Sequence, residues 1–361
     1  MSRAGQPRSS VANEAAGFIS YLKAKKPIDD RALNARVWQG MQETLRQRDR
    51  RRTLRVLELG CGIGTMLERA LERGLFAQGH SRYARKAAAQ VRQPARKSPA
   101  AAGRGPVRLR TRVEYTGVDA SAGLISEAHR RLSGWSARLG FAAQPAEADS
   151  LERDGLHVLV RWVTADAFDH AADPTLLGAH DLLLAHAFLD LVDARRAAQA
   201  FLPLLRPGGL FYFSLLFDGV THFEPGFDPG LDARIERLYH QTMDERTADG
   251  RPSGSSRTGR VLLRLLPEAG GQLLQAGSSD WVIFPRGRAY LPEEALLLQH
   301  ILATVEKALR GHPELAPRDL QRWMECRLAQ LERRELCYLA HQIDLFGSYL
   351  PPGLPPRGKP C

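Results

Sequence analysis

Cysteine is scarce in this sequence of 361 residues, and long apolar runs are missing altogether. The four cysteines are Cys61, Cys326, Cys337 and Cys361, and they form no C-x-x-C pair and no spacing typical of metal ligands. We therefore expect no bound metal and a reducing, cytoplasmic setting. No stretch approaches the ~20 apolar residues that span a bilayer, and residues 1–10 lack the apolar core of a signal peptide, so no membrane association is expected.

Acidic residues are missing from one stretch, Ala77 to Val113, which holds ten lysines and arginines. The formal net charge is +11, so nearly all of the excess positive charge lies there. The stretch is rich in Ala, Gly, Pro and Gln, which predicts a disordered insertion over 77–113. Tyr83 is its one aromatic residue, and base stacking needs more. A solvated loop is therefore favoured over an RNA-binding arm at 80–112, although nucleic acid stays open as a partner.

Glycine is concentrated after one apolar run, Leu54–Leu59, which carries Glu58 near its end. Three glycines follow at alternate positions, Gly60, Gly62 and Gly64. The pattern predicts a strand, a tight turn and a helix over Met66–Arg73. Glycines let a ligand approach the backbone, and a helix N-terminus favours polar or negative groups. The loop is therefore a candidate nucleotide or cofactor site.

Two common glycine-loop motifs are incomplete here. A P-loop needs a lysine followed by Ser or Thr after its last glycine, but Gly64 is followed by Thr65 and Met66. The dinucleotide fingerprint needs glycine at its sixth position, which is Thr65. Both ligand classes, and with them a nicotinamide dehydrogenase, are disfavoured.

Apolar runs alternate with helical patterns through the middle of the chain, which is typical of a parallel sheet. The strands expected are Leu54–Leu59, Glu114–Val118, Val158–Thr164, His180–Ala185 and Leu210–Leu216, with a strand near Trp281–Phe284 and an antiparallel one at Cys337–Phe346. Helices are expected at Ala122–Leu132, Val192–Leu205, Val261–Ala269, Glu293–Leu309 and Leu320–Leu336.

Acids follow the first three strands, at Glu58, Asp119 and Asp166. Ligands of an open parallel sheet bind beyond the carboxyl ends of its strands, so we expect the three side chains to share a site. An acid after the second strand can accept both hydroxyls of a ribose, and one after the third can accept from an adenine amino group. Each acid has a second interpretation as a helix N-cap.

The E-x-G-x-G-x-G loop, the two later acids and the Leu-Arg-Pro-Gly-Gly-Leu turn at 205–210 resemble class I S-adenosylmethionine (SAM)-dependent methyltransferases. The resemblance covers 54–216, with a continuation to 346. It implies an α/β, doubly wound, mostly parallel seven-stranded sheet and SAM as co-substrate. The SAM-binding residues that it implies are Glu58, Gly60, Cys61, Gly62, Gly64, Asp119, Ala120, Asp166, Ala167 and His186. The chain departs from some members at 185–191, which holds neither Asn-Pro-Pro-aromatic nor Pro-Cys, and this counts against base methylation.

The expected organisation has three parts: a tail and helical lid at 1–50, a SAM-binding domain at 51–346, and a disordered Pro-rich tail at 347–361. The lid should contain two helices separated at Pro27, with Asp29 or Asp30 capping the second. Inserts at 218–256 and 288–336 read as helical and would form a roof over the acceptor side of the site.

A roofed pocket favours a small-molecule O or N acceptor. The catalytic candidates are His186 and His222, and Asp190 and Glu224 are further candidates for a general base. Two alternatives remain: an RNA or protein methyltransferase that uses the basic segment, and a SAM-binding protein without catalysis. The oligomeric state is left open.

Overall fold

The computed structural model describes residues 8–48, 52–77, 111–143, 149–248 and 250–353. A central sheet of ten strands runs through this part of the chain. Five strands are parallel: β1 (Leu54–Leu59), β2 (Thr111–Asp119), β5 (Leu156–Thr164), β6 (His180–His186) and β7 (Leu205–Glu224). Five are antiparallel additions: β3 (Ala142–Ala143), β4 (Ser150–Arg153), β10 (Gly271–Ser278), β11 (Trp281–Ile283) and β12 (Cys337–Tyr349).

The order of the strands creates a crevice at the middle of the sheet. It is β10-β12-β7-β6-β1-β2-β5-β4-β3, with β11 paired to β12. The chain moves outward from β1 to β2 and β5, then returns to place β6 on the other side of β1. Such a reversal opens a ligand crevice at the carboxyl ends of the two central strands. The expected α/β, doubly wound, mostly parallel fold is confirmed, with ten strands rather than seven because β3, β4 and β11 are short additions.

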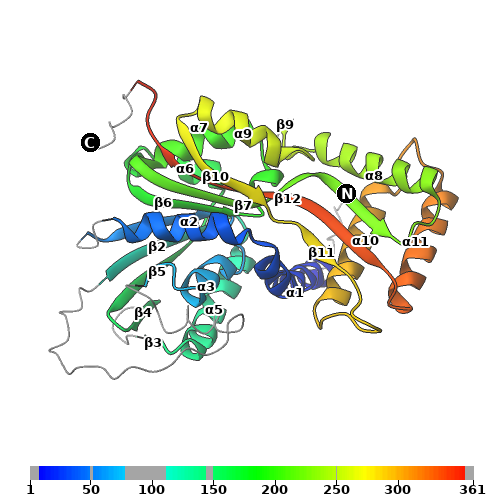
Figure 1. The fold of residues 1–361 in the computed structure, drawn as a ribbon, viewed down its shortest axis with the longest axis horizontal. Coiled ribbons are helices and arrows are strands. Elements are labelled where there is room, and N and C mark those ends of the chain that lie inside the picture. The colour runs from blue at the N-terminus through cyan, green and yellow to red at the C-terminus, as the bar shows by residue number, and fades with distance from the viewer. Residues whose placement is uncertain (1–7, 49–51, 78–110, 144–148, 249, 354–361) are drawn as a thin grey trace, which may run out of the picture.

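Helices cover both faces of the sheet (Figure 1). One face carries α2 (Ala35–Arg46), α3 (Thr65–Glu72) and α5 (Ala122–Arg138), and the other carries α6 (Ala167–Ala171), α7 (Ala194–Phe201) and α9 (Thr258–Glu268). Short 3-10 turns lie at Pro174–Leu176, Leu189–Leu191 and Leu202–Leu204. Along β1, Val56 packs into the first layer and Leu57 into the second, as the two-residue period of a strand requires.

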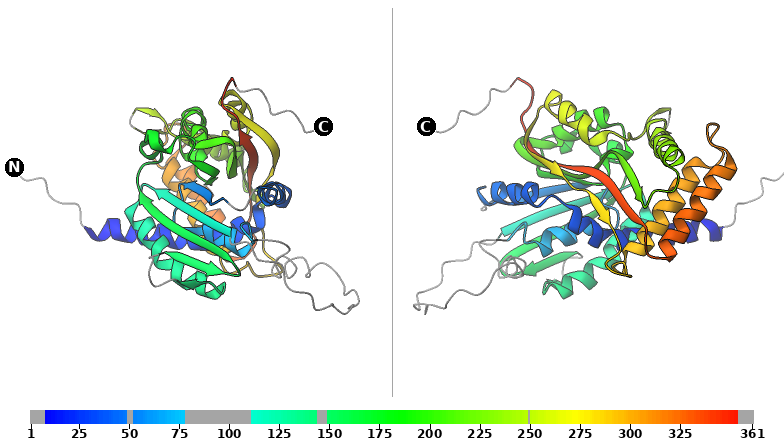
Figure 2. Two further views of the ribbon diagram at one scale, coloured as in Figure 1. Left: turned by 90° about the vertical axis from the view of Figure 1, so that its left-hand side faces the viewer. Right: turned by 45° about the vertical axis from the view of Figure 1, so that its right-hand side comes forward.

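A third apolar cluster lies beyond one end of the parallel sheet (Figures 1 and 2). There α1 (Arg8–Ala32), α8 (Pro229–Asp244), α10 (Glu294–Leu309) and α11 (Pro317–Glu332) gather around the extended ends of β7 and β12. A separate hairpin, β8 (Thr247–Ala248) with β9 (Arg251–Pro252), follows α8.

Two expected boundaries are corrected by this layer. Residues 218–224 continue β7 rather than starting a helical insert, because Phe217 and Phe223 are buried in the cluster and pair along β12. Residues 347–349 belong to β12 rather than to a tail, because Tyr349 is buried and pairs with Gly271 of β10.

The N-terminal helices also differ from expectation. Helix α1 continues through Pro27, and the residue that caps α2 is Asn34, whose side chain accepts from the amides of Arg36 and Val37, both at 3.1 Å. Asp29 and Asp30 instead lie in the last turns of α1. The expected disordered insertion at 77–113 lies almost wholly outside the described residues, as does most of the expected tail.

Candidate functional site

A cavity of about 1060 Å³ opens at the carboxyl ends of the central strands. Nine of the ten residues that the resemblance implies for SAM binding line it: Glu58, Gly60, Cys61, Gly62, Asp119, Ala120, Asp166, Ala167 and His186. The tenth, Gly64, lies behind the cavity wall as the N-cap of α3. A Cβ there would stand 2.8 Å from the ring of Trp162, so this position has no room for a side chain.

The glycine loop is held tightly to the neighbouring strand. The amide of Cys61 donates to the Val118 carbonyl at 3.0 Å, and that of Gly62 donates to Asp119 Oδ2 at 2.9 Å. Gly60 has a φ of +68°, and a Cβ on it would lie 2.5 Å from Phe188 Cγ. The loop therefore brings its backbone to the cavity, but two of its amides already donate within the protein.

The acids after β2 and β5 face the cavity and also fix local backbone. Asp119 Oδ1 accepts from the Ser121 amide at 2.9 Å, in addition to the bond from Gly62. Asp166 caps α6, with Oδ1 accepting from Phe168 at 2.7 Å and from Asp169 at 3.2 Å. A carboxylate has about four acceptor sites, so both acids keep capacity to accept from a ligand.

Glu58 lies at the floor of the cavity with an exposed fraction of 1%. Burial raises its pKa to about 8, while the hydrogen bond from the Tyr115 hydroxyl acts in the opposite direction. The side chain is therefore mostly neutral at pH 7, and an added positive charge nearby would favour its ionised form.

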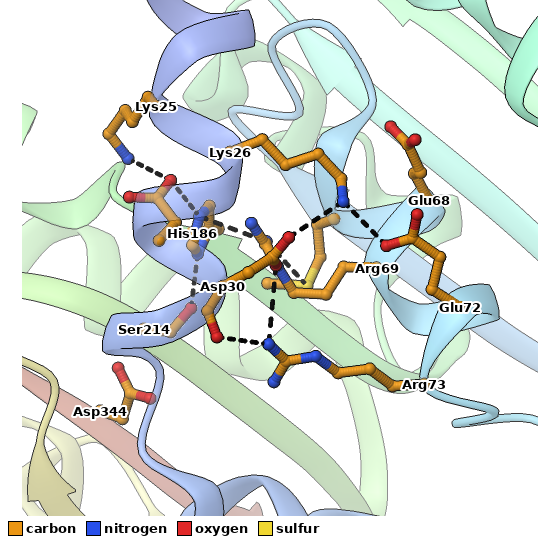
Figure 3. A network of polar contacts seen from close by, with 12 residues as sticks. Lys25, Lys26, Asp30, Glu68, Arg69, Glu72, Arg73, His186, Ser214 and Asp344 are labelled. Atoms are coloured by element: carbon orange, nitrogen blue, oxygen red, sulfur yellow. Dashed lines mark hydrogen bonds and ion pairs between the residues drawn. The ribbon is translucent and has the colours of Figure 1, made fainter. Parts of the chain in front are cut away.

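His186, at the end of β6, has partners for both ring nitrogens (Figure 3). Nδ1 lies 2.8 Å from Ser214 Oγ, and Nε2 lies 3.1 Å from Oδ2 of Asp29. Burial, with Arg69 nearby, lowers the pKa of His186 to about 4, so the imidazole is neutral at pH 7. The geometry makes it a link between the sheet and α1.

Asp29 joins that link to two more buried groups. It accepts from Lys25 Nζ at 2.6 Å and from Trp281 Nε1 at 3.0 Å. Burial acts to raise its pKa, but Lys25 and His186 outweigh burial and lower the pKa to about 2. The charged pair is compensated inside the protein, as a buried ion pair requires.

His222, the second catalytic candidate, does not line this cavity. It lies near the end of β7 with 55% of its side chain exposed and its Nε2 3.1 Å from Oε1 of Glu224. The structure therefore brings His186 and Asp190 to the cavity and leaves His222 and Glu224 outside it.

One wall of the cavity is the inner face of α1, in the segment where the sequence predicts a helical lid, although no residue of this segment was among the predicted site residues. Its lining side chains follow a helical period: Phe18, Tyr21, Leu22, Lys25 and Asp29. The i, i+3, i+4, i+7, i+11 spacing could have predicted a common face, but not that the face looks into a ligand cavity. Aromatic side chains from β7, α8, β11 and β12 complete this half of the cavity: Phe217, Tyr239, Trp281 and Tyr338.

Within the described residues, no group of His, Cys, Asp or Glu is arranged to hold a metal ion. In the same part of the chain, no helix has the length and apolar content needed to cross a membrane.

No protein-family model and no curated protein matches this sequence. Solved structures resemble it at low identity. A provisionally assigned methyltransferase of Bacillus halodurans is 10% identical over 86% of this chain and 98% of that one, with a TM-score of 0.42. A provisionally assigned sarcosine dimethylglycine methyltransferase of Galdieria sulphuraria is 14% identical over 86% and 85%, with a TM-score of 0.35. The [4+2]-cyclase SpnF is 14% identical over 87% and 81%, also at 0.35. The fold assignment rests on the strand order given above.

Proposed function

We propose that this chain is a class I methyltransferase that transfers a methyl group from SAM to an oxygen or nitrogen of a small molecule. One observation carries the proposal: a single cavity joins the glycine loop and the three acids Glu58, Asp119 and Asp166 to a part lined by aromatic side chains. Ligand pockets usually measure ~300–1,000 Å³, so about 1060 Å³ leaves room for a co-substrate and an acceptor together.

The residues at the glycine-loop end of the cavity fit SAM. Asp119 and Asp166 keep acceptor capacity for ribose hydroxyls and for an adenine amino group. Glu58 is a buried acid whose ionised form would be stabilised by the positive charge of the methionine portion of SAM. Gly60 admits no Cβ, because one would collide with the ring of Phe188, so the loop backbone itself lines the cavity there. When bound, SAM supplies an electrophilic methyl group on sulfur.

The chain's own contribution is positioning and exclusion of water. Helix α1 lies over the glycine loop, with Leu22 Cδ1 3.7 Å from where a Cβ on Gly62 would stand. Its Asp29 is bonded to the neutral His186 of β6, which holds this wall closed against the sheet.

Calorimetric titration with SAM tests the first half of the proposal. Wild-type protein should bind SAM, and Asp119→Ala and Asp166→Ala should each weaken binding at least about tenfold, because each removes a charged acceptor. Asp193→Ala is the matched control, since Asp193 caps α7 through the amides of Arg195 and Arg196 but does not line the cavity. Equal loss of SAM affinity in all three variants would reduce the effect to lost hydrogen bonds with the backbone and remove the site assignment.

Transfer itself is tested with methyl-labelled SAM and a cell extract. Label in the low-molecular-weight fraction is the expected result. Label in RNA or protein would replace the small-molecule part of the proposal with the alternative that uses segment 80–112. SAM binding without any label transfer would favour a non-catalytic SAM-binding protein.

A further inference from the structure

We propose that Asp190 binds the O–H or N–H group of the methyl acceptor, that the Asp190 carboxylate receives its proton, and that Gln342 accepts from a second N–H or O–H of the same molecule where it has one. The inference rests on the proposed function and specifies its acceptor. The acceptor class is a small molecule with an aromatic or apolar body and a hydroxyl or amino group at the atom that is methylated.

Asp190 lies in the 3-10 turn that follows β6, on the edge of the crevice. Its Oδ1 is buried, and no hydrogen-bond partner for it exists in the described part of the chain. A buried acceptor without a partner costs free energy, so a carboxylate oxygen at a cavity wall favours a ligand that donates to it. None of the interactions described above for SAM uses this oxygen.

The backbone of this turn is held by the segment after the β8–β9 hairpin. Ser253 Oγ donates to the Leu191 carbonyl at 3.0 Å. Gly254 packs so closely that a Cβ on it would stand 2.6 Å from the Asp190 carbonyl oxygen. The backbone of Asp190 is therefore held in place by residues 253 and 254. Little rearrangement of this turn is needed before a ligand binds.

Four titratable side chains of the cavity lining interact electrostatically with Asp190: Tyr21 and Lys25 of α1, Tyr239 of α8, and Arg246 just after α8. Burial raises the pKa of Asp190, whereas Lys25 and Arg246 act to lower it. A carboxylate whose pKa is raised toward neutrality accepts a proton more readily than an exposed one. Burial raises the pKa of both tyrosines, so they stay protonated near neutral pH.

Gln342 of β12 supplies a second unpartnered group. It is 5% exposed, lines the cavity, and its Oε1 lacks a hydrogen-bond partner among the described residues. Its backbone amide is fixed by Asp280 Oδ1 at 3.2 Å. Oδ1 of Asp190 and Oε1 of Gln342 can therefore each accept a hydrogen bond from a ligand. The same cavity is also lined by Phe217 and Trp281. Aromatic walls with few polar groups suit a flat or apolar body whose orientation those groups fix.

The step balances in atoms and electrons. The acceptor oxygen or nitrogen uses a lone pair to form a bond to the methyl carbon. The bond between that carbon and sulfur breaks, and its electron pair stays on sulfur, which leaves a neutral thioether. The proton of the acceptor passes to the Asp190 carboxylate and from there to solvent. Asp190 is a catalytic residue in this scheme, because it touches the reacting group.

Matched ligand pairs that differ only in the donor test the inference. 2-Naphthol is compared with 2-methoxynaphthalene, and 4-isopropylaniline with its N,N-dimethyl derivative, by saturation-transfer NMR titration with and without S-adenosylhomocysteine (SAH). In wild-type protein, at least one donor should bind at least about tenfold more tightly than its methylated partner, because the site's buried acceptors stay unpaired with the latter. The pair that shows the preference identifies oxygen or nitrogen as the methylated atom.

Asp190→Ala should reduce that preference to within about twofold, and Gln342→Leu should reduce it partly in the aniline pair, whose amino group has a second hydrogen to donate. Asp193→Ala, outside the cavity, should keep it. Equal affinities within both pairs in wild-type protein, or an unchanged preference in Asp190→Ala, would overturn the inference. Failure of the wild-type protein to bind SAH would instead count against the proposed function, because donor preference is also measured without SAH.

Discussion

Oδ2 of Asp29 lies 3.1 Å from Nε2 of His186, and this contact joins α1 to the last residue of the central strand β6. The same carboxylate holds the buried ammonium of Lys25 and the indole N–H of Trp281. One side chain therefore connects α1, the crevice and β11, so its removal should affect the whole acceptor half of the cavity.

Asp29→Ala should cost about 3–5 kcal/mol of unfolding free energy, because it leaves the 7%-exposed Lys25 as a buried charge without its partner. The measurement is urea denaturation at pH 7. Glu306→Ala is the control, since Glu306 pairs with Arg310 at 2.8 Å on an exposed helix face and should contribute under about 1 kcal/mol. Equal losses in the two variants would contradict a central role for Asp29.

His186 should make the protein sensitive to mild acid. Its pKa is lowered to about 4 from an ordinary 6.5. Between these two pH values the imidazole is protonated in the unfolded chain but stays neutral in the folded one. Stability from this group is full above pH 6.5 and is lost as pH falls toward 4. Between pH 7 and pH 5 the loss amounts to about 2 kcal/mol. Urea denaturation of wild-type protein and of His186→Gln at pH 7 and pH 5 makes the measurement. The wild type should lose more unfolding free energy between these pH values than the variant does, and equal losses would be inconsistent with a buried neutral imidazole.

Glu58 should act in the opposite sense. Its pKa is raised to about 8 from an ordinary 4.5, so the folded state holds a proton that the unfolded state releases. The group's stabilising effect is present below pH 4.5 and falls as pH rises toward 8. Between pH 6 and pH 8, the unfolding free energy of the unliganded wild-type protein should fall by about 2 kcal/mol, and that of Glu58→Gln should not show this fall. A variant that follows the wild-type curve over this range would show that Glu58 is already ionised.

Local patterns in the sequence predicted the parallel part of the sheet, because each strand carries its own apolar run. The bounds of β1 are those expected, and the acids after β1, β2 and β5 reach one cavity. Strand β10 was missed, since Gly271–Ser278 has two glycines and no β-branched residue, and its pairing with β12 determines it.

The N-terminal wall of the site was harder to predict. A break at Pro27 followed by Asp29 is a reasonable helix start, but the helix continues because buried contacts of Lys25 and Asp29 outweigh the ~3 kcal/mol cost of proline. Asp190 and Gln342 lie far apart along the chain and carry no common motif. Only the folded chain shows that both carry a buried oxygen with no hydrogen-bond partner among the residues that the structure describes.

Two effects of a substitution at Gly60 can be measured separately: the steric conflict with Phe188 and the strain of a positive φ. Gly60 and Gly178 have similar φ values, +68° and +65°, but a Cβ on Gly178 would meet nothing within 4 Å. Alanine at either position should cost ~1–2 kcal/mol for the left-handed backbone. Gly60→Ala must also displace Phe188, whose Cβ lies 2.9 Å from the new methyl group, so it should weaken SAM binding while Gly178→Ala does not. Thermal unfolding and SAM titration of both variants measure the two effects, and equal SAM affinities would mean that Phe188 yields without cost.

Helix α1 should open to admit SAM, because it covers the glycine loop. Besides the buried bond between Asp29 and His186, its closing contacts are polar (Figure 3). The partly exposed Lys26 reaches Glu72 at 2.8 Å, and Asp30 pairs with the buried Arg69 and, through its carbonyl, accepts from Arg73 at 2.6 Å. The partly exposed ion pair breaks at low cost, so the unliganded helix should exchange its amide hydrogens faster than the buried strands do.

SAM binding should therefore slow hydrogen exchange over residues 18–29 and leave α11, which does not line the cavity, unchanged. Lys26→Ala removes the closing contact with Glu72, together with a bond to Asp30 within α1, and should speed exchange of α1 in the unliganded protein, with a smaller effect once SAM is bound. Mass-spectrometric hydrogen exchange with and without SAM makes the measurement. Protection confined to the glycine loop, with α1 exchanging alike in both states, would mean that SAM enters by another route and that α1 is a fixed wall.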